Sequence, residues 1–123
     1  MAGTTTYTGS CHCGAVRYRV TTKLESAMTC NCSMCSRSGT MLTFVPAAQF
    51  EQLSGQEALR DYQFGKKKIH HLFCSRCGIK PFARGVAPDG SDVVAVNVRC
   101  LEGVDLGAVP LRSFDGRSLP VES

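Results

Sequence analysis

Seven of the eight cysteines occur in three short clusters, and their spacing is typical of zinc ligands. The clusters are Cys11-His12-Cys13, Cys30-Asn31-Cys32-Ser33-Met34-Cys35 and Cys74-Ser75-Arg76-Cys77. A structural zinc ion takes four protein ligands, whereas a catalytic zinc ion takes three and leaves one position for water or substrate. Seven thiols divide naturally into four and three. The sequence therefore predicts one closed site that stabilises the fold and one open site that supports chemistry.

The spacing also indicates which cysteines belong together. Cys30, Cys32 and Cys35 lie within six residues, so one loop can wrap three sulfurs around one side of an ion and leave the other side free. We assign these three to the open, catalytic site. The two remaining pairs each form a zinc knuckle, and together they complete the closed site of Cys11, Cys13, Cys74 and Cys77.

Two alternatives remain open from the residues alone. In an ordinary zinc ribbon, Cys32 and Cys35 would join the last pair, and three thiols would have no role: Cys11, Cys13 and Cys30. The even count of eight cysteines also permits a disulfide framework. The N-terminus reads as a polar strand rather than an apolar leader, so we expect reduced thiols in a cytoplasmic protein.

Length and composition indicate one small domain with no membrane-spanning segment. At 123 residues and 43% apolar, the chain can form a modest core to which bound metal adds stability. Its apolar runs are far shorter than the roughly 20 residues of a membrane helix. The net charge is +4. Seven thiolates and two zinc ions would lower it to about +1, which argues against a nucleic-acid partner.

Alternation of apolar and polar residues predicts a fold made mostly of strands. Val16, Tyr18 and Val20 alternate with arginines, and the valines of residues 94–98 alternate in the same way. Further strands are expected at residues 4–8, 40–45, 58–64, 68–73 and 80–84. Single helical turns are expected at 47–50 and 101–104, and a turn or hairpin loop at 86–91. The predicted fold is all-β, a single domain over residues 1–123 with its core at about 7–115.

The cysteine pairs fall where predicted strands give way to turns. Gly14 follows the first pair and Gly78 follows the last, and glycine lets the backbone curl around a metal ion. His12 lies between two ligands, and alternation along an extended knuckle should point its ring away from the metal. This placement is the one that a zinc knuckle requires.

Four segments together carry a more specific pattern. They are Gly9-Ser10-Cys11-His12-Cys13-Gly14-Ala15-Val16-Arg17-Tyr18, Cys30-Asn31-Cys32-Ser33-Met34-Cys35, Phe73-Cys74-Ser75-Arg76-Cys77-Gly78 and Val94-Ala95-Val96-Asn97-Val98-Arg99-Cys100-Leu101. In this order they resemble the glutathione-dependent formaldehyde-activating enzyme family, which also includes the centromere protein V relatives. The resemblance covers roughly residues 7–115.

The resemblance implies a fold and a metal complement. The fold would be a β-tent, an all-β zinc fold of several small antiparallel sheets with zinc knuckles and little helix. Two zinc ions per chain are implied. By motif position, the structural ligands correspond to Cys11, Cys13, Cys74 and Cys77, and the catalytic ligands to Cys30, Cys32 and Cys35. This division agrees with the one that spacing favours.

The resemblance also implies an activity. The family's founding reaction adds the glutathione thiol to formaldehyde and gives S-hydroxymethylglutathione, and the enzyme counts as a carbon–sulfur lyase because the reverse reaction cleaves that bond. The expected partners are a small-molecule thiol and an aldehyde, with glutathione as co-substrate. Two other hypotheses are a non-catalytic zinc module that binds protein or nucleic acid, and a carrier of glutathione or zinc.

A few residues outside the clusters are candidates for supporting roles. Glutathione carries two carboxylates, which suit arginine, and the candidates are Arg37, just beyond the open cluster, and Arg99, at the end of a strand near Cys100. Cys100 is a candidate fourth ligand of the open site, a redox thiol or a small buried apolar residue. His70 and His71 are adjacent on a predicted strand, so one should point inward and the other outward.

Overall fold

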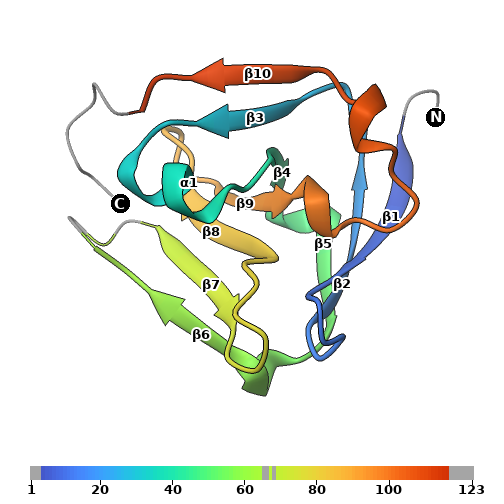
Figure 1. Ribbon diagram of the computed structural model, residues 1–123, viewed down its shortest axis with the longest axis vertical. Coiled ribbons are helices and arrows are strands. Elements are labelled where there is room, and N and C mark those ends of the chain that lie inside the picture. Colours follow the sequence, from blue (N-terminus) through green and yellow to red (C-terminus); the bar gives the residue numbers. More distant parts are fainter. Residues whose placement is uncertain (1–3, 65–66, 68, 117–123) are drawn as a thin grey trace.

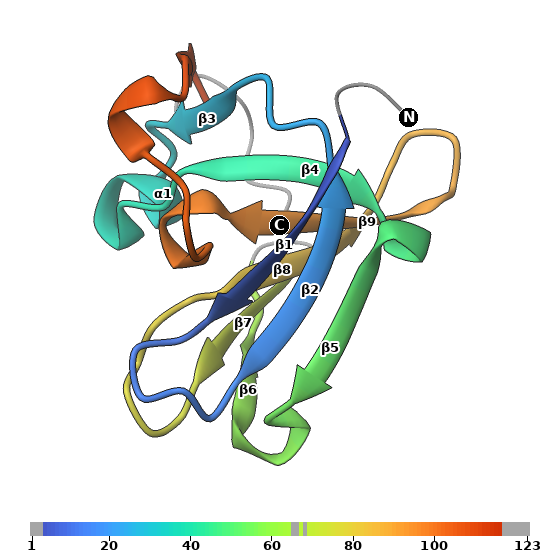
Figure 2. The same ribbon diagram turned by 90° about the vertical axis from the view of Figure 1, so that its right-hand side faces the viewer.

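The computed structural model describes residues 4–64, 67 and 69–116, and β-strands make up most of this part of the chain. Two sheets pack against each other (Figure 1). The smaller sheet has the order β1-β2-β5, with β1 at Thr5–Ser10, β2 at Arg17–Thr22 and β5 at Phe50–Ser54. Figure 2 shows this sheet in front of β8 and β9 of the larger one.

The larger sheet has the order β10-β3-β4-β9-β8-β7-β6. Its strands are β3 (Ala27–Cys30), β4 (Leu42–Pro46), β6 (Leu59–Tyr62), β7 (His70–Cys74), β8 (Phe82–Val86), β9 (Asp92–Asn97) and β10 (Leu111–Phe114). The all-β prediction is confirmed. The expected antiparallel pairing has one exception, because β10 runs parallel to β3 and places Phe114 opposite Cys30.

The core lies between the two sheets and is built from the two alternating segments. Their inward side chains are fully buried: Val16, Tyr18, Val20, Val94, Val96 and Val98. Burial of such side chains contributes about 1.5–3 kcal/mol each. The Tyr18 ring stacks on Phe50 with centroids 5.2 Å apart and meets Phe82 edge-on at 5.5 Å. These rings join the smaller sheet to the larger one.

Each strand predicted from the sequence forms, with ends moved by no more than two residues. Lys68, the predicted start of one strand, lies outside the described residues. The expected turn after Pro46 is a 3₁₀ helix at Ala47–Gln49. The expected loop at 86–91 is a tight turn between β8 and β9, closed by the Ala87 N–H, which donates to the Ser91 carbonyl at 2.8 Å.

The helical turn expected at residues 101–104 is wrong. Leu101 instead forms an isolated bridge to Gly9, and Gly103 adopts a φ of 75°, which is incompatible with a right-handed helix. The 3₁₀ helices of this region lie on either side, at Val98–Cys100 and Leu106–Ala108. No helix in the described part of the chain has the length and apolar character needed to cross a bilayer.

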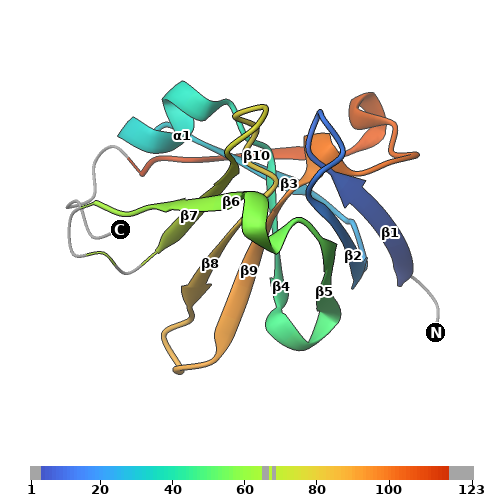
Figure 3. The same ribbon diagram turned by 90° about the horizontal axis from the view of Figure 1, so that it is seen from below.

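One side of the molecule gathers the segments that carry the cysteines. The helix α1 (Ser33–Ser38), the β1–β2 connection and the β7–β8 connection all lie along the upper edge of Figure 3. The two cysteine pairs that ligand spacing assigned to the closed site, Cys11 with Cys13 and Cys74 with Cys77, are thus brought together from opposite sheets. The remaining group, Cys30, Cys32 and Cys35, lies at α1 on the same side.

Candidate metal centres and the pocket beside them

The first centre consists of Cys11, Cys13, Cys74 and Cys77, whose sulfurs lie within 4.8 Å of one another. The Cys13 sulfur is 3.6 Å from that of Cys11 and 3.7 Å from that of Cys74. Sulfurs bound tetrahedrally to zinc at about 2.3 Å would be about 3.8 Å apart, whereas a disulfide bond is about 2.05 Å long. The spacing fits a tetrahedral ion. All eight cysteines are unpaired, so a disulfide framework is excluded.

The backbone around this first centre forms two knuckles. The Val16 N–H donates to the Cys11 sulfur at 3.3 Å, and the Arg76 N–H donates to the Cys74 sulfur at 3.4 Å. The Gly78 N–H donates to the Cys74 carbonyl at 2.8 Å, and Gly78 has a φ of 80°, which glycine adopts without strain, so the turn expected after this pair is present. The N–H groups of Val16 and Arg76 stabilise the thiolate forms of the two cysteines.

The first centre is part of the hydrophobic core. Cys11 is 2% exposed and Cys74 is 0% exposed. An ion bound here would join the β1–β2 connection to the β7–β8 connection, and therefore one sheet to the other. This arrangement suits a structural role.

The second centre consists of Cys30, Cys32 and Cys35, with sulfurs again within 4.8 Å of one another. Cys30 ends β3, and Cys32 is the N-terminal cap of α1, so a helix rather than a loop carries the last cysteine. The Cys32 N–H donates to the Cys30 sulfur at 3.4 Å, and the Cys35 N–H donates to the Cys32 sulfur at 3.3 Å. Within the described residues, no fourth Cys, His, Asp or Glu completes this group.

The two groups are separate, so the zinc-ribbon alternative is wrong. That alternative combined Cys32 and Cys35 with Cys74 and Cys77. Cys32 and Cys35 are instead grouped with Cys30, and backbone N–H groups of this short segment donate to the sulfurs of Cys30 and Cys32.

The chain near its C-terminal end covers part of the second centre. A Cβ added at Gly116 would lie 2.6 Å from the Cys30 sulfur and 3.1 Å from the Cys32 Cβ, so the backbone at 116 runs directly against these ligands. The Asn31 side-chain amide donates to the Asp115 carboxylate at 2.9 Å and holds this segment in place. Glycine at 116 is therefore required by space.

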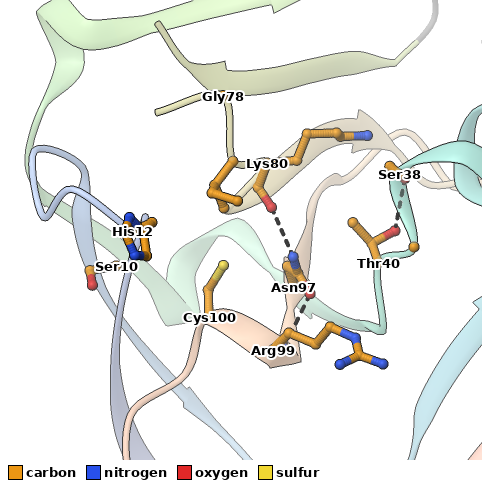
Figure 4. Close-up of a pocket in the computed structure, with 11 residues that line it drawn as sticks. Ser10, His12, Ser38, Thr40, Gly78, Lys80, Asn97, Arg99 and Cys100 are labelled. Atoms are coloured by element: carbon orange, nitrogen blue, oxygen red, sulfur yellow. Dashed lines mark hydrogen bonds between the residues drawn. The ribbon is translucent and has the colours of Figure 1, made fainter. Parts of the chain in front are cut away.

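A pocket of about 470 Å³ is bordered by both centres (Figure 4): His12 and Gly78 belong to the knuckles of the first centre, and Ser38 ends the helix of the second, but none of the seven clustered cysteines lines it. Gly39, which lines the pocket, donates its N–H to the Cys35 carbonyl at 2.9 Å, so the wall of the pocket is continuous with the helix that carries this ligand. His12, Lys80 and Arg99 also line the pocket, and its described lining contains no acidic side chain. The pocket is therefore suited to an anionic ligand.

Asn97 holds three walls of this pocket together. Its side chain is buried, and its Nδ2 donates to the Lys80 carbonyl at 3.0 Å. Its Oδ1 accepts from the Met41 N–H at 3.4 Å and from the Arg99 N–H at 3.1 Å. Sequence reasoning identified the strand that contains Asn97 but assigned the residue no role.

The two adjacent histidines of β7 point in opposite directions, as predicted. His70 is exposed, and its Nδ1 donates to the Asp61 carboxylate at 2.6 Å. His71 is buried and stacks on the Phe64 ring with centroids 5.2 Å apart. Burial and the nearby Lys80 ammonium lower the pKa of His71 to about 4, so the ring is neutral near pH 7.

Lys80 contacts this histidine and also lines the pocket. Its Nζ donates to His71 Nδ1 at 3.3 Å. Burial lowers the pKa of the Lys80 ammonium, and the thiolates of Cys35 and Cys32 act in the opposite direction. Within the described part of the chain, no carboxylate lies within ion-pair distance of this ammonium.

The remaining candidates separate into those in the pocket and those outside it. Arg99 lines the pocket, whereas Arg37 is absent from its lining and donates to the Ser33 carbonyl at 2.8 Å on α1. Cys100 lines the pocket, and burial together with the charges of Cys11 and Cys77 raises its pKa to about 11. Cys100 is not part of the three-sulfur group, so the candidate role as its fourth ligand is wrong.

Comparisons with known proteins place this geometry in context. Residues 6–110 match a family model described as glutathione-dependent formaldehyde-activating enzyme. A crystal structure of a protein from Rhodobacter sphaeroides is similar, with a TM-score of 0.74 and 35% sequence identity. The similarity covers 85% of this chain and 99% of that chain.

Proposed function

Because the chain belongs to the glutathione-dependent formaldehyde-activating enzyme family, we propose that it catalyses the addition of a thiol to an aldehyde. Glutathione and formaldehyde are the proposed substrates, and S-hydroxymethylglutathione is the product. The reverse reaction cleaves a carbon–sulfur bond, which makes the protein a carbon–sulfur lyase. The observations that carry the proposal are a three-sulfur centre and a pocket lined by Lys80 and Arg99, whose wall at Gly39 is hydrogen-bonded to the Cys35 carbonyl.

Zinc fits both centres, and we propose two ions per chain. Thiolates are preferred zinc ligands, and the sulfur spacing at the first centre matches a tetrahedral ion. Cys11, Cys13, Cys74 and Cys77 would hold the structural ion, and Cys30, Cys32 and Cys35 the catalytic one. At the second centre zinc would supply a Lewis acid that favours the thiolate form of an incoming thiol.

The pocket explains how the rest of glutathione would be held. Its two carboxylates need cationic partners, and Arg99 in the lining can bind one of them through two parallel hydrogen bonds. Arg37 lies outside the lining and stays a second candidate. The volume of about 470 Å³ is in the range of small-molecule pockets.

The proposed reaction needs no oxidant. The sulfur lone pair forms the new bond to the aldehyde carbon, and the π electrons of the carbonyl move to its oxygen. The proton that left the thiol returns to this oxygen and gives the hydroxyl of the product. Substrate thiols and site cysteines must both be reduced, which agrees with the expected cytoplasmic location.

The test is exchange spectroscopy with ¹³C-formaldehyde and glutathione, in which the rate of interconversion is measured with and without the protein. The zinc-loaded protein should speed interconversion in proportion to its concentration, and a folded Cys32→Ser variant should not. If the wild-type protein binds glutathione without speeding this exchange, the carrier hypothesis replaces the enzyme. If it neither binds glutathione nor speeds exchange, the binding-module hypothesis is favoured.

A further inference from the structure

The Lys80 ammonium is a half-buried cation whose charge no described carboxylate balances. Lysine is rarely buried unless it is paired. Figure 4 shows its side chain extending along the pocket, and its hydrogen-bond partner is the neutral ring of His71. The negative groups that act on it are the thiolates of Cys35 and Cys32. The positive charge therefore lies in the wall of the pocket, where it is hydrogen-bonded to His71 and no described carboxylate neutralises it.

The hydrogen bond to His71 fixes how that ring is protonated. An ammonium has only donors, so His71 Nδ1 must accept and its proton must be on Nε2. Within the described residues, the buried Nε2 has no hydrogen-bond partner. A phenyl ring would stack on Phe64 without leaving a polar atom unsatisfied. The use of an imidazole here is explained by the bond that Nδ1 makes to Lys80.

The backbone on both sides of Lys80 is also held firmly. Asn97 donates to the Lys80 carbonyl at 3.0 Å, and the Tyr18 hydroxyl donates to the carbonyl of the following Pro81 at 3.3 Å. On the other side, the Cys74 N–H donates to the Ile79 carbonyl at 2.9 Å. Lys80 is thus held both at its main chain and at its ammonium group, as preorganised electrostatic catalysis requires.

We propose that Lys80 stabilises the alkoxide oxygen that forms when a thiolate adds to the aldehyde carbon, and that His71 positions the ammonium. This inference rests on the proposed function. As the carbon–sulfur bond forms, the carbonyl π electrons move to oxygen, and Lys80 pairs with the resulting negative charge while it stays protonated. Water then delivers to this oxygen the proton that the thiol released. In the reverse direction water removes the proton of the product's hydroxyl, Lys80 stabilises the resulting alkoxide, and the oxygen lone pair reforms the carbonyl as the carbon–sulfur bond breaks and the thiolate leaves.

The kinetic test uses two matched pairs of variants. Lys80→Met keeps the length of the side chain without its charge, and should lower kcat about 100-fold while KM for glutathione changes less than about threefold. Lys80→Arg should recover part of the loss. His71→Phe should lower kcat about tenfold, and His71→Asn, whose Oδ1 takes the position of Nδ1, should recover most of it.

The positional test uses nitrogen-15 NMR of the zinc-loaded protein. His71 Nδ1 should be unprotonated and Nε2 protonated in the wild type, and Lys80→Met should allow a mixture of tautomers. His71→Phe should melt no lower than the wild type, because it removes an unsatisfied buried atom. If His71 had only a structural role, His71→Phe would melt at a lower temperature than the wild type, and Lys80→Met would leave the tautomer of His71 unchanged.

The outcomes separate this inference from the function on which it rests. If the wild type speeds the exchange and Lys80→Met keeps its kcat, or raises only KM, the role of Lys80 is wrong and the proposed function stands. Protonation of His71 at Nδ1 would also overturn the pairing. If the wild type does not speed the exchange at all, both proposals fall.

Discussion

The side-chain amide of Asn97 donates to the backbone carbonyl of Lys80 at 3.0 Å, and the same buried side chain accepts two further backbone N–H groups. We predict that Asn97→Asp destabilises the protein by about 1–3 kcal/mol, because a carboxylate cannot donate to the Lys80 carbonyl and the carbonyl is left unsatisfied. Urea unfolding measures this change. Gln56→Ala, which removes an exposed amide, is the control and should have almost no effect.

Loss of a ligand should have different effects at the two centres. Cys11→Ser or Cys74→Ser should leave the domain unfolded, since both cysteines are buried in the core and binding worth on the order of 10 kcal/mol is coupled to folding. Cys32→Ser, at a half-buried position on one side of the molecule, should give a folded and inactive protein. Circular dichroism distinguishes the two results. Equal melting of both kinds of variant would contradict the division into structural and catalytic sites.

Metal should leave the two centres in a fixed order. A mild chelator should remove one zinc ion first and without unfolding, because the second centre has three described protein ligands and the first has four. Metal analysis after partial chelation should give one zinc per chain, and alkylation followed by mass spectrometry should modify Cys30, Cys32 and Cys35. Modification of Cys11 or Cys74 at that stage would reverse our assignment.

Gly116 provides a test of the second centre alone. Gly116→Ala should reduce zinc from two ions per chain to one, because the added Cβ would lie 2.6 Å from the Cys30 sulfur. The melting temperature should change little, since the first centre and the core are untouched. Gly107→Ala is the matched control, because its Cβ would meet the Asp105 carboxylate oxygen at 3.4 Å, close to ordinary van der Waals contact. Two zinc ions per chain in Gly116→Ala would contradict the prediction, because the backbone around residue 116 would then have shifted to make room for the added methyl group.

The buried His71 should make stability fall at mildly acidic pH. Its pKa is lowered to about 4 in the folded state, so between about pH 6.5 and 4 the unfolded chain binds more protons than the native one. The stabilising contribution is complete above about pH 6.5 and is lost as the pH falls. Between pH 8 and 5 the loss should be about 2 kcal/mol. In urea titrations at both pH values, the free energy of unfolding of His71→Phe should fall by about 2 kcal/mol less than that of the wild type. An equal fall in both proteins would contradict the effect of His71 burial.

The strands that could be predicted from the sequence are those with a clear inside and outside. Alternation found β2 and β9 because every second side chain is fully buried, Tyr18 and Val20 in β2 and Val94 and Val96 in β9, while the residues between them are more exposed. Three strands were missed, β3, β5 and β10; burial alternates along β5, but its residue types do not, because Gln52 is on the more buried side and Leu53 is exposed. All four residues of β10 are exposed, so hydrophobic periodicity gives it no signal. Its pairing with β3 is a long-range contact that local sequence does not encode.

Ligand spacing made the metal centres predictable, but the pocket depends on contacts distant in sequence. The cysteines of each knuckle are two or three residues apart, so their grouping follows from local geometry. Lys80 and His71 meet across the β7–β8 connection, and Asn97 reaches Lys80 from a different strand. An asparagine at the end of an apolar strand was the available signal, because its amide must find partners there.

The parallel pairing of β10 with β3 has a kinetic consequence. The hydrogen bond between Asn31 and Asp115 joins residues 84 positions apart, so the segment over the second centre docks only after a long loop has closed. Because β10 is an exposed edge strand, its detachment should cost less than global unfolding. Isotope exchange of zinc at Cys30, Cys32 and Cys35 would then keep pace with hydrogen exchange of the β10 amides, while zinc at the first centre would exchange only as fast as the whole domain opens.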